Sequence, residues 1–405
     1  MESENLFDEN CLSEWGTRSR TTEGQHSLFA RLSPLLVIKL LPLRVFNDLK
    51  SSLVYGELCD QRTSDDKRQS NIYDTECVAA LILNRAFNKF EFQDVRKLAA
   101  ELCGRIHPDV LFPIISSQLE YAAITHDVLK IKACLFSVCT SLVIRGKDSL
   151  RHPALLKCRK EIETVLSWPS LDGDEVLQAQ HGCIDCLALM VCTELQASES
   201  VRESASVETS VHGKSSSSGN ITRTSFHGYV IHQLTHDEKE CASSSKLGTT
   251  GRLSEDARSL SFRLCMANVL ISACQKISDT GRKAFSQKIV PQLIQHVGAT
   301  KKSEIRAACV QVLFSAVYHL KSDVLPYSSD LLEVSMKSLK HGSEKERMAG
   351  AKLMASLMAS EETVIGAISE GLMEARALLS NLSLTDPSPD LRQLCQKLLV
   401  CLTSP

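Results

Sequence analysis

The sequence has few of the residues that tight turns and β-structure require. Aromatic residues make up 5% of the 405 residues, and there are only 18 glycines and 11 prolines. Chains built from many short strands usually carry more of these residues, because each strand ends in a turn. Hydrophobic residues nevertheless make up 43% of the chain, which is sufficient for a substantial core. The composition therefore favours a folded protein made of helices.

Long apolar segments and an excess of charge of one sign are also missing. The most apolar stretch, residues 33–46, is interrupted by Lys39, Pro42 and Arg44, so no membrane span is predicted. Residues 1–25 lack the basic start and apolar core of a secretory signal, which predicts a cytoplasmic or nuclear location. The formal net charge of −2 argues against a nucleic-acid partner.

Recognisable catalytic motifs are absent as well. The segment "HGKSSSSG" at 212–219 contains Gly-Lys-Ser, but Glu208 stands where a phosphate-binding loop needs its first glycine. No GxSxG elbow, GxGxxG turn or suitably placed Cys–His arrangement occurs. The sequence therefore predicts no catalytic residues, no cofactor and no enzyme activity. An enzyme with an unrecognised metal or thiol site remains an alternative.

Two short motifs have partial metal-ligand spacing. Cys183 and Cys186 form a CxxC pair, but a zinc site needs a second such pair or two suitably spaced histidines. His232 and His236 are four residues apart, without the glutamate of a zinc-protease motif and within a Ser-rich part of the chain. We interpret the first pair as structural and the second as solvated, and predict no metal site.

What the sequence does contain is a repeated helical pattern. In residues 302–320, apolar or small side chains recur at the spacing of one buried helical face, with Ser303 and Glu304 placed as N-cap and first-turn acid. Copies of this pattern begin at Val95, Ile131, Val176, Ala257, Ile305, Glu346 and Leu391. They are 36–48 residues apart, except for one interval of 81 residues. Such a period is typical of repeats that stack on one another.

Cysteine recurs on the buried face of these copies. The positions are Cys103, Cys139, Cys265, Cys309 and Cys395. In a reducing compartment the sixteen cysteines of the chain are expected to be thiols. A cysteine on a buried face acts as a small hydrophobic residue where two helices approach closely.

Each copy follows another apolar segment, and four of these segments contain proline. Proline is tolerated in the first turn of a helix, so the repeating unit is predicted to be a pair of helices. The segment "GSEKE" at 342–346 predicts a capping box from Ser343 to Glu346.

The single long interval between copies has a different composition. It is rich in Ser, Thr and Gly, which predicts a disordered insertion at 197–250, with 226–238 as a short helix or docking motif. The predicted organisation is a disordered segment at 1–27, helical repeats at 28–196, this insertion, and helical repeats at 251–405. Within the first repeat region, residues 28–60 are a candidate additional helix pair.

The period, the proline-containing first helix and the start of the second helix resemble the HEAT and armadillo-type α-solenoid proteins. The start reads acid, apolar, Arg, as in "SEIRAACVQVL" and "FQDVRKLAAELC". The resemblance implies an all-α fold, a right-handed superhelix of stacked antiparallel helix pairs, with second helices lining a concave surface. It also implies an inter-repeat ladder made of Asp94, Arg96, Lys132, Asp256, Arg258, Glu304, Arg306, Arg347, Asp390 and Arg392.

The predicted function is that of a non-catalytic scaffold or adaptor that binds a protein partner along the concave face. A cargo binder similar to transport receptors is an alternative that an acidic inner surface would favour. The other alternative is the enzyme with an unrecognised metal or thiol site. The sequence identifies neither the partner nor the oligomeric state.

Overall fold

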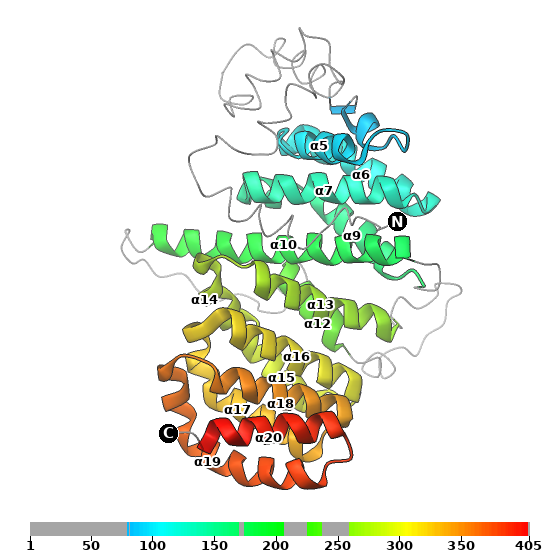
Figure 1. Cartoon of the computed structure of the whole chain (residues 1–405). Coiled ribbons are helices and arrows are strands. Elements are labelled where there is room, and N and C mark those ends of the chain that lie inside the picture. Colours follow the sequence, from blue (N-terminus) through cyan, green and yellow to red (C-terminus); the bar gives the residue numbers. More distant parts are fainter. Residues whose placement is uncertain (1–78, 81, 170–173, 206–224, 237–258, 404–405) are drawn as a thin grey trace, which may run out of the picture. The chain divides into compact units, whose positions relative to one another are not determined.

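The computed structural model describes residues 79–80, 82–169, 174–205, 225–236 and 259–403 (Figure 1). All regular secondary structure within these residues is helical. The chain divides into two compact units, Met1–Thr193 and Glu194–Pro405, and the division falls inside the long helix α10 (Asp174–Ala205). The segment 1–27, predicted to be disordered, and the candidate helix pair at 28–60 lie outside the described residues.

Unit 1 is built from pairs of helices. The second helix of one pair contacts the second helix of the next pair. A short helical stretch at 82–86 precedes α5, and α6 and α7 form an adjacent pair. Helix α5 packs on α7, and α6 packs on α9, so second helices lie against second helices and first against first. The bounds are α5 Gln93–Gly104, α6 Pro108–Thr125, α7 Val128–Arg145, α8 Lys147–Arg151 and α9 Ala154–Leu166. The start of α10 completes the unit.

Close approach of α5 and α7 depends on one glycine. A Cβ placed on Gly104 would collide with the side chain of Thr140 and the backbone carbonyl of Ser137. Ser137 also donates a hydrogen bond of 2.9 Å from its hydroxyl to the Ala100 carbonyl, which joins the two helices directly. The absence of a side chain at residue 104 therefore sets how tightly this interface packs.

Unit 2 repeats the same arrangement over more helices. The pairs are α12 with α13, α15 with α16, α17 with α18, and α19 with α20. The second helices α13, α16, α18 and α20 contact one another in succession (Figure 1), and so do the first helices α12, α15, α17 and α19. The bounds are α12 Phe226–Thr235, α13 Leu260–Lys276, α14 Asp279–Lys288, α15 Val290–Ala299, α16 Ser303–Leu320, 3₁₀-helix η4 Lys321–Tyr327, α17 Ser328–His341, α18 Glu344–Met358, α19 Glu362–Thr385 and α20 Pro389–Thr403.

The predicted fold class is confirmed: the described chain is all-α and consists of stacked helix pairs. Each predicted copy of the pattern lies in a helix, except that Ala257 is outside the described residues and α13 begins at Leu260. The predicted capping box of Ser343 and Glu346 is present. The predicted N-cap of α16 is wrong, because Lys302 is the N-cap and Ser303 is the first residue of the helix.

The predicted cysteine positions are core positions in most copies. Cys103, Cys139, Cys309 and Cys395 are buried, whereas Cys265 is half-buried. Burial raises the pKa of the Cys309 thiol to about 12. A thiol with so high a pKa stays protonated at neutral pH and acts as a small apolar side chain.

The predicted insertion at 197–250 needs correction at its start, and the short helix predicted within 226–238 is present. Helix α10 continues to Ala205, and residues 226–235 form α12, which packs on α13. The apolar side chains of Val230 and Leu234 are fully buried, which explains why a short segment in a polar region folds against the repeats. The remaining residues of the insertion lie outside the described part of the chain.

Helix α10 is the longest of the described helices. Its segment Asp174–Ser198 is the only stretch of the described residues long and apolar enough to cross a membrane, by length and composition alone. Of the most apolar 18-residue window, 72% is buried among other parts of the protein. We therefore interpret α10 as a core helix.

Candidate functional site: the second-helix strip and the arginine ladder

The second helices α13, α16 and α18 of unit 2 expose side chains mainly along one line. Helix α16 contacts α13, α18 and α15, so only the side opposite α15 reaches the surface. In each of these helices a set of exposed positions recurs every seven residues, which places that set on one face of the helix. We call the following set the second-helix strip: Ser261, Asn268 and Gln275 on α13, Glu304, Gln311 and Tyr318 on α16, and Lys345 and Lys352 on α18.

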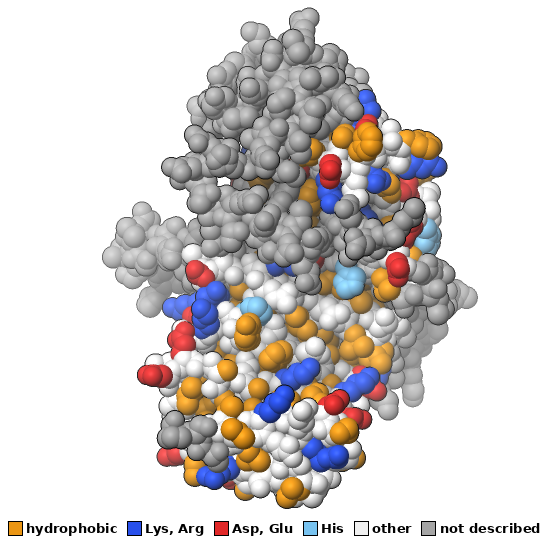
Figure 2. Space-filling model, in the orientation of Figure 1, with side chains coloured by type: hydrophobic (Ala, Val, Ile, Leu, Met, Phe, Trp, Pro, Cys, Tyr) orange, Lys and Arg blue, Asp and Glu red, His pale blue; other side chains and the backbone are white. Residues whose placement is uncertain are grey.

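The strip is mainly uncharged. Three amide side chains and a serine accompany one carboxylate and two lysines, and the Tyr318 ring is 66% exposed. Figure 2 shows basic side chains standing among hydrophobic and uncharged ones over the α16 and α18 region of this face. A surface of this kind can accept and donate hydrogen bonds through its amides while the tyrosine ring supplies apolar contact area.

An ion pair joins the start of α16 to the start of α18. Arg306 donates from Nε to Oε1 of Glu346 at 2.5 Å and from Nη2 to Oε2 at 3.3 Å. The Glu346 side chain is almost completely buried, whereas the Arg306 side chain is 28% exposed. Arg306 also donates from Nη1 to the carbonyls of Thr300 and Lys301, which end the connection from α15.

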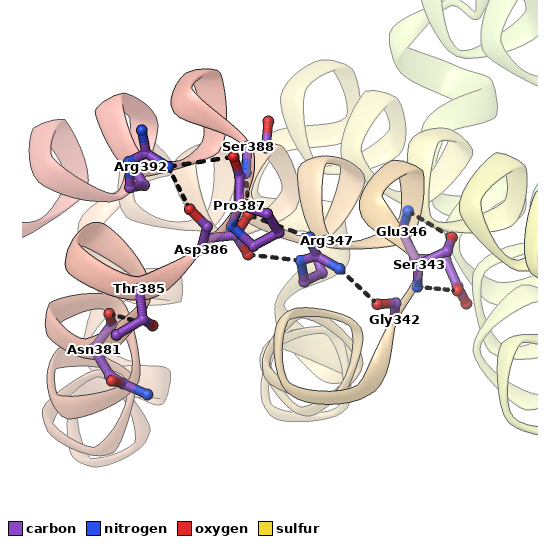
Figure 3. A network of polar contacts seen from close by, with 10 residues as sticks. All are labelled: Gly342, Ser343, Glu346, Arg347, Asn381, Thr385, Asp386, Pro387, Ser388 and Arg392. Carbon is purple, nitrogen blue, oxygen red and sulfur yellow. Dashed lines mark hydrogen bonds and ion pairs between the residues drawn. The ribbon is translucent and has the colours of Figure 1, made fainter.

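The next repeat contains the same combination of an ion pair and a hydrogen bond to a loop carbonyl. Arg347 of α18 donates from Nε to Oδ2 of Asp386 at 2.7 Å and from Nη2 to Oδ1 at 3.2 Å (Figure 3). Its Nη1 donates to the carbonyl of Gly342, before the start of α18. Arg392 of α20 makes only the contacts to the preceding loop, by donating to the carbonyls of Asp386 and Pro387.

These residues form one continuous set, which we call the arginine ladder: Arg306, Glu346, Arg347, Asp386 and Arg392. Each arginine fixes the loop before its own helix through a carbonyl five or six residues earlier. Arg306 and Arg347 also reach an acid in the next repeat. Because bidentate Arg–carboxylate pairs are directional, the ladder sets the register of one repeat on the next.

Glu346 serves two structural roles at once. Its side chain accepts a hydrogen bond of 2.7 Å from the backbone N–H of Ser343, which forms half of the α18 capping box, and it accepts from Arg306. Burial raises the pKa of Glu346, but the hydrogen bonds from Arg306 and Ser343 outweigh burial and leave the pKa below its ordinary value. The carboxylate is therefore ionised at neutral pH.

The structure places the predicted ladder residues in different settings. Arg306, Arg347 and Arg392 belong to the ladder, whereas Asp256 and Arg258 lie outside the described residues. The predicted acids are instead exposed in the first turns of their helices, at Asp94, Glu304 and Asp390. The acids that meet the arginines are Glu346 and Asp386. The signal for them was a spacing of 40 and 39 residues from Arg306 and Arg347.

In unit 1 the two predicted basic positions have no such acid. Arg96 of α5 and Lys132 of α7 line a cavity of about 250 Å³, together with Lys97 and Glu175. The Lys132 ammonium donates a hydrogen bond to the side-chain carbonyl of Gln178 at the start of α10. No ion pair within 4.0 Å joins Arg96 or Lys132 to a carboxylate among the described residues.

The candidate metal-ligand pairs are placed in the core and on α12. Cys183 and Cys186 are buried, and a hydrogen bond with Cys139 together with burial raises the pKa of Cys186 well above its ordinary value. The rings of His232 and His236 stack with their centres 4.7 Å apart. Among the described residues, no group of three or more His, Cys, Asp or Glu side chains is arranged to hold a metal ion.

Each unit has a fold made of helix pairs, in which first helices stack on first helices and second helices stack on second helices. It is armadillo/HEAT-like. No protein-family model matches the sequence, and no curated protein matches it. Among solved structures, the chain is similar to a designed armadillo repeat protein, with a TM-score of 0.33 and 13% identity over 80% of this chain and 98% of that one. It is also similar to an engineered protein, with a TM-score of 0.35 and 11% identity over 97% and 99% of the two chains.

Proposed function

We propose that this protein is a non-catalytic scaffold that binds a protein partner along the second-helix strip. The observation that supports the proposal is the exposure of Tyr318, at 66%, on a strip that also carries Asn268, Gln275 and Gln311. Tyrosine is enriched in protein interfaces because its ring buries a large area with little loss of conformational entropy. The amides can hydrogen-bond to backbone groups of a partner.

The stacking of the second helices gives the strip the rigidity that binding requires. Helix α16 packs against both α13 and α18, and the arginine ladder fixes the starts of α16 and α18 relative to each other. A partner that docks on the strip therefore pays little ordering cost on the scaffold side.

The charge of the strip does not favour the cargo-binder alternative. Its charged members are the carboxylate of Glu304 and the ammonium groups of Lys345 and Lys352. A receptor for basic segments needs an excess of acidic side chains on its binding face. The strip has an excess of basic ones.

Site-specific photocrosslinking tests the proposal. A photoreactive phenylalanine analogue placed at residue 318 should link the full chain to one stoichiometric protein in extracts of the native organism. The same analogue at Glu333, which is exposed on the first helix α17, is the matched control. Equal labelling from residues 318 and 333 would contradict binding at the strip.

A binding measurement with the partner so identified completes the test. Tyr318→Ala should weaken binding by about tenfold or more while the helical circular dichroism stays unchanged. A second variant lacks residues 206–224, which connect α10 to α12 and lie outside the described residues. Loss of binding with this deletion, and full binding by Tyr318→Ala, would assign recognition to that segment and refute the proposal.

A further inference from the structure

The cavity in unit 1 has more positive than negative groups. It is about 250 Å³ in volume and lies between α5, α7 and the start of α10. Three basic side chains line it, from Arg96, Lys97 and Lys132, with Glu175 as the one carboxylate among its lining residues. When these groups are ionised, two positive charges are in excess.

Comparison with the arginine ladder of unit 2 shows which carboxylate this cavity lacks. Glu346, the acid that pairs with Arg306, directly precedes the basic position Arg347 of its own helix. In α7 the basic position is Lys132, and the residue before it is Ile131, which is fully buried. The repeat after Arg96 therefore offers an apolar side chain where the repeat after Arg306 offers a carboxylate.

Arg96 has no replacement for this acid. Its Nε is buried and has no hydrogen-bond partner, and its guanidinium makes no hydrogen bond or ion pair with other described residues. Other arginines with a buried unpaired nitrogen differ, because Arg145 donates to the Arg105 carbonyl and Arg282 pairs with Asp279. A desolvated donor without an acceptor is costly, and an anion in the cavity would remove that cost.

Lys132 lines the same cavity, and its ammonium donates a hydrogen bond to the side-chain carbonyl of Gln178. Burial lowers its pKa most, the carboxylate of Glu175 raises it, and the positive charge of Arg96 lowers it to a smaller extent. Two cations thus face one space from two stacked helices, and their mutual repulsion makes an anion between them favourable.

We propose that this cavity binds a phosphate monoester dianion through Arg96 and Lys132, with Lys97 as the third cation. A phosphate monoester carries about two negative charges at neutral pH, which matches the excess of two positive charges. The planar guanidinium of Arg96 can donate two parallel hydrogen bonds to phosphate oxygens. A phosphodiester carries one charge and matches less well.

This inference goes beyond the proposed function. It concerns residues of unit 1, whereas the second-helix strip is in unit 2, and it is testable without a protein partner. Failure at the cavity would leave the strip unaffected, and failure of crosslinking at residue 318 would leave the cavity unaffected.

Calorimetric titration of the full chain at constant ionic strength tests the site. The probes are inorganic phosphate, a phosphoserine peptide, the same peptide without phosphate, and dimethyl phosphate as a diester. We expect binding of the first two, and at least about tenfold weaker binding of the other two. Tighter binding of the phosphopeptide than of phosphate would assign the source to a phosphorylated protein, and the reverse would assign it to a small molecule.

Three variants identify the residues. Arg96→Gln and Lys132→Gln should each weaken phosphate binding by about tenfold or more. Arg96→Lys keeps the charge and should weaken it less than Arg96→Gln. Lys340→Gln, an exposed lysine on the first helix α17 and outside the second-helix strip, is the control and should have no effect.

Stability gives a readout that a purely structural role of Arg96 would not produce. Without phosphate, Arg96→Gln should leave the melting temperature of the chain unchanged or raise it, because it removes an unpaired cation beside Lys132. Lack of phosphate binding by the unmodified chain, or equal weakening by Lys340→Gln, would overturn the proposal. So would a large loss of stability in Arg96→Gln, because it would reveal an intramolecular partner.

Discussion

Arg347→Gln should destabilise unit 2 by about 3 kcal/mol, because it breaks the best-buried rung of the ladder. The Arg347 and Asp386 side chains are 17% and 2% exposed, so solvent screens the pair only weakly. Removing one partner of a buried ion pair costs about 3–5 kcal/mol, since the remaining charge stays buried. We take the lower end because Asp386 keeps a hydrogen bond of 2.9 Å from the backbone N–H of Ser388.

The assay must separate the two units. Stability in repeat folds is close to a sum of neighbouring interfaces, so the loss should concentrate where the rung is missing. Hydrogen exchange followed by mass spectrometry should show faster exchange in α17–α20 and unchanged exchange in α5–α9. For a unit of this size, a loss of about 3 kcal/mol corresponds to a fall in melting temperature of about 6–12 °C.

Two further variants complete the experiment. Lys345→Gln changes an exposed lysine two residues from Arg347 and should alter stability by less than about 0.5 kcal/mol. The double variant Arg347→Gln with Asp386→Asn should lose at least about 1 kcal/mol less than the sum of the single variants, since no charge is left buried. An Arg347→Gln effect as small as that of Lys345→Gln would refute the reasoning.

Three other predictions follow from contacts within single units. The pKa of Glu346 is below its ordinary value in the folded chain, so its stabilisation is present above pH about 4.5 and is lost as the pH falls through the folded value. Urea midpoints at successive pH values should therefore fall on acidification, and Arg306→Gln should reduce that dependence; an unchanged profile would be inconsistent with the pair. Gly104→Ala should lower the free energy of unfolding by about 2 kcal/mol, because the added Cβ collides with Thr140. The fluorescence of Trp168 in a Trp15→Phe background measures this loss, and a neutral result would mean that α5 and α7 can separate freely. Glu194→Gln should speed hydrogen exchange in α12. The carboxylate accepts hydrogen bonds from the backbone N–H groups of Phe226 and His227 and contacts the His227 ring. Unchanged exchange would show that apolar packing alone holds α12.

The pKa of Glu194 supports the last of these predictions. Burial raises it, but the hydrogen bonds from His227 and from the backbone of Phe226 outweigh burial and leave it below its ordinary value. The carboxylate is thus stabilised in its charged form at the start of α12. Its neutral amide replacement keeps the shape and removes the charge, which isolates the electrostatic part of the attachment.

Several features of the fold could be predicted from the sequence because they depend on neighbours along the chain. The pattern from Ile305 predicted a helix that the structure has at Ser303–Leu320, since a face repeating every 3.6 residues is a local property. The capping box of Ser343 and Glu346 involves residues three apart, so it was readable as well. Burial of Cys103 and Cys309 followed from their place on the same faces.

Contacts between repeats were decided by the tertiary structure alone. The acids that meet Arg306 and Arg347 lie about one repeat further along the chain, whereas the repeated sequence pattern favoured acids two residues before the arginines. A side chain at the start of a helix can reach either its own turn or the next repeat, and only the stacking of the second helices decides which. Burial of Glu346 then adds the desolvation that makes the pair specific.

The candidate sites depend on the same distinction. Sequence periodicity alone determined that this chain folds into stacked helix pairs, because a repeating buried face is encoded residue by residue. Which residues stay exposed on the second helices, and that Arg96 and Lys132 line one cavity with no carboxylate of the described residues in ion-pair contact, were decided only when neighbouring helices came into contact. Solvent exposure and charge pairing are properties of the assembled surface, since each depends on side chains distant in sequence.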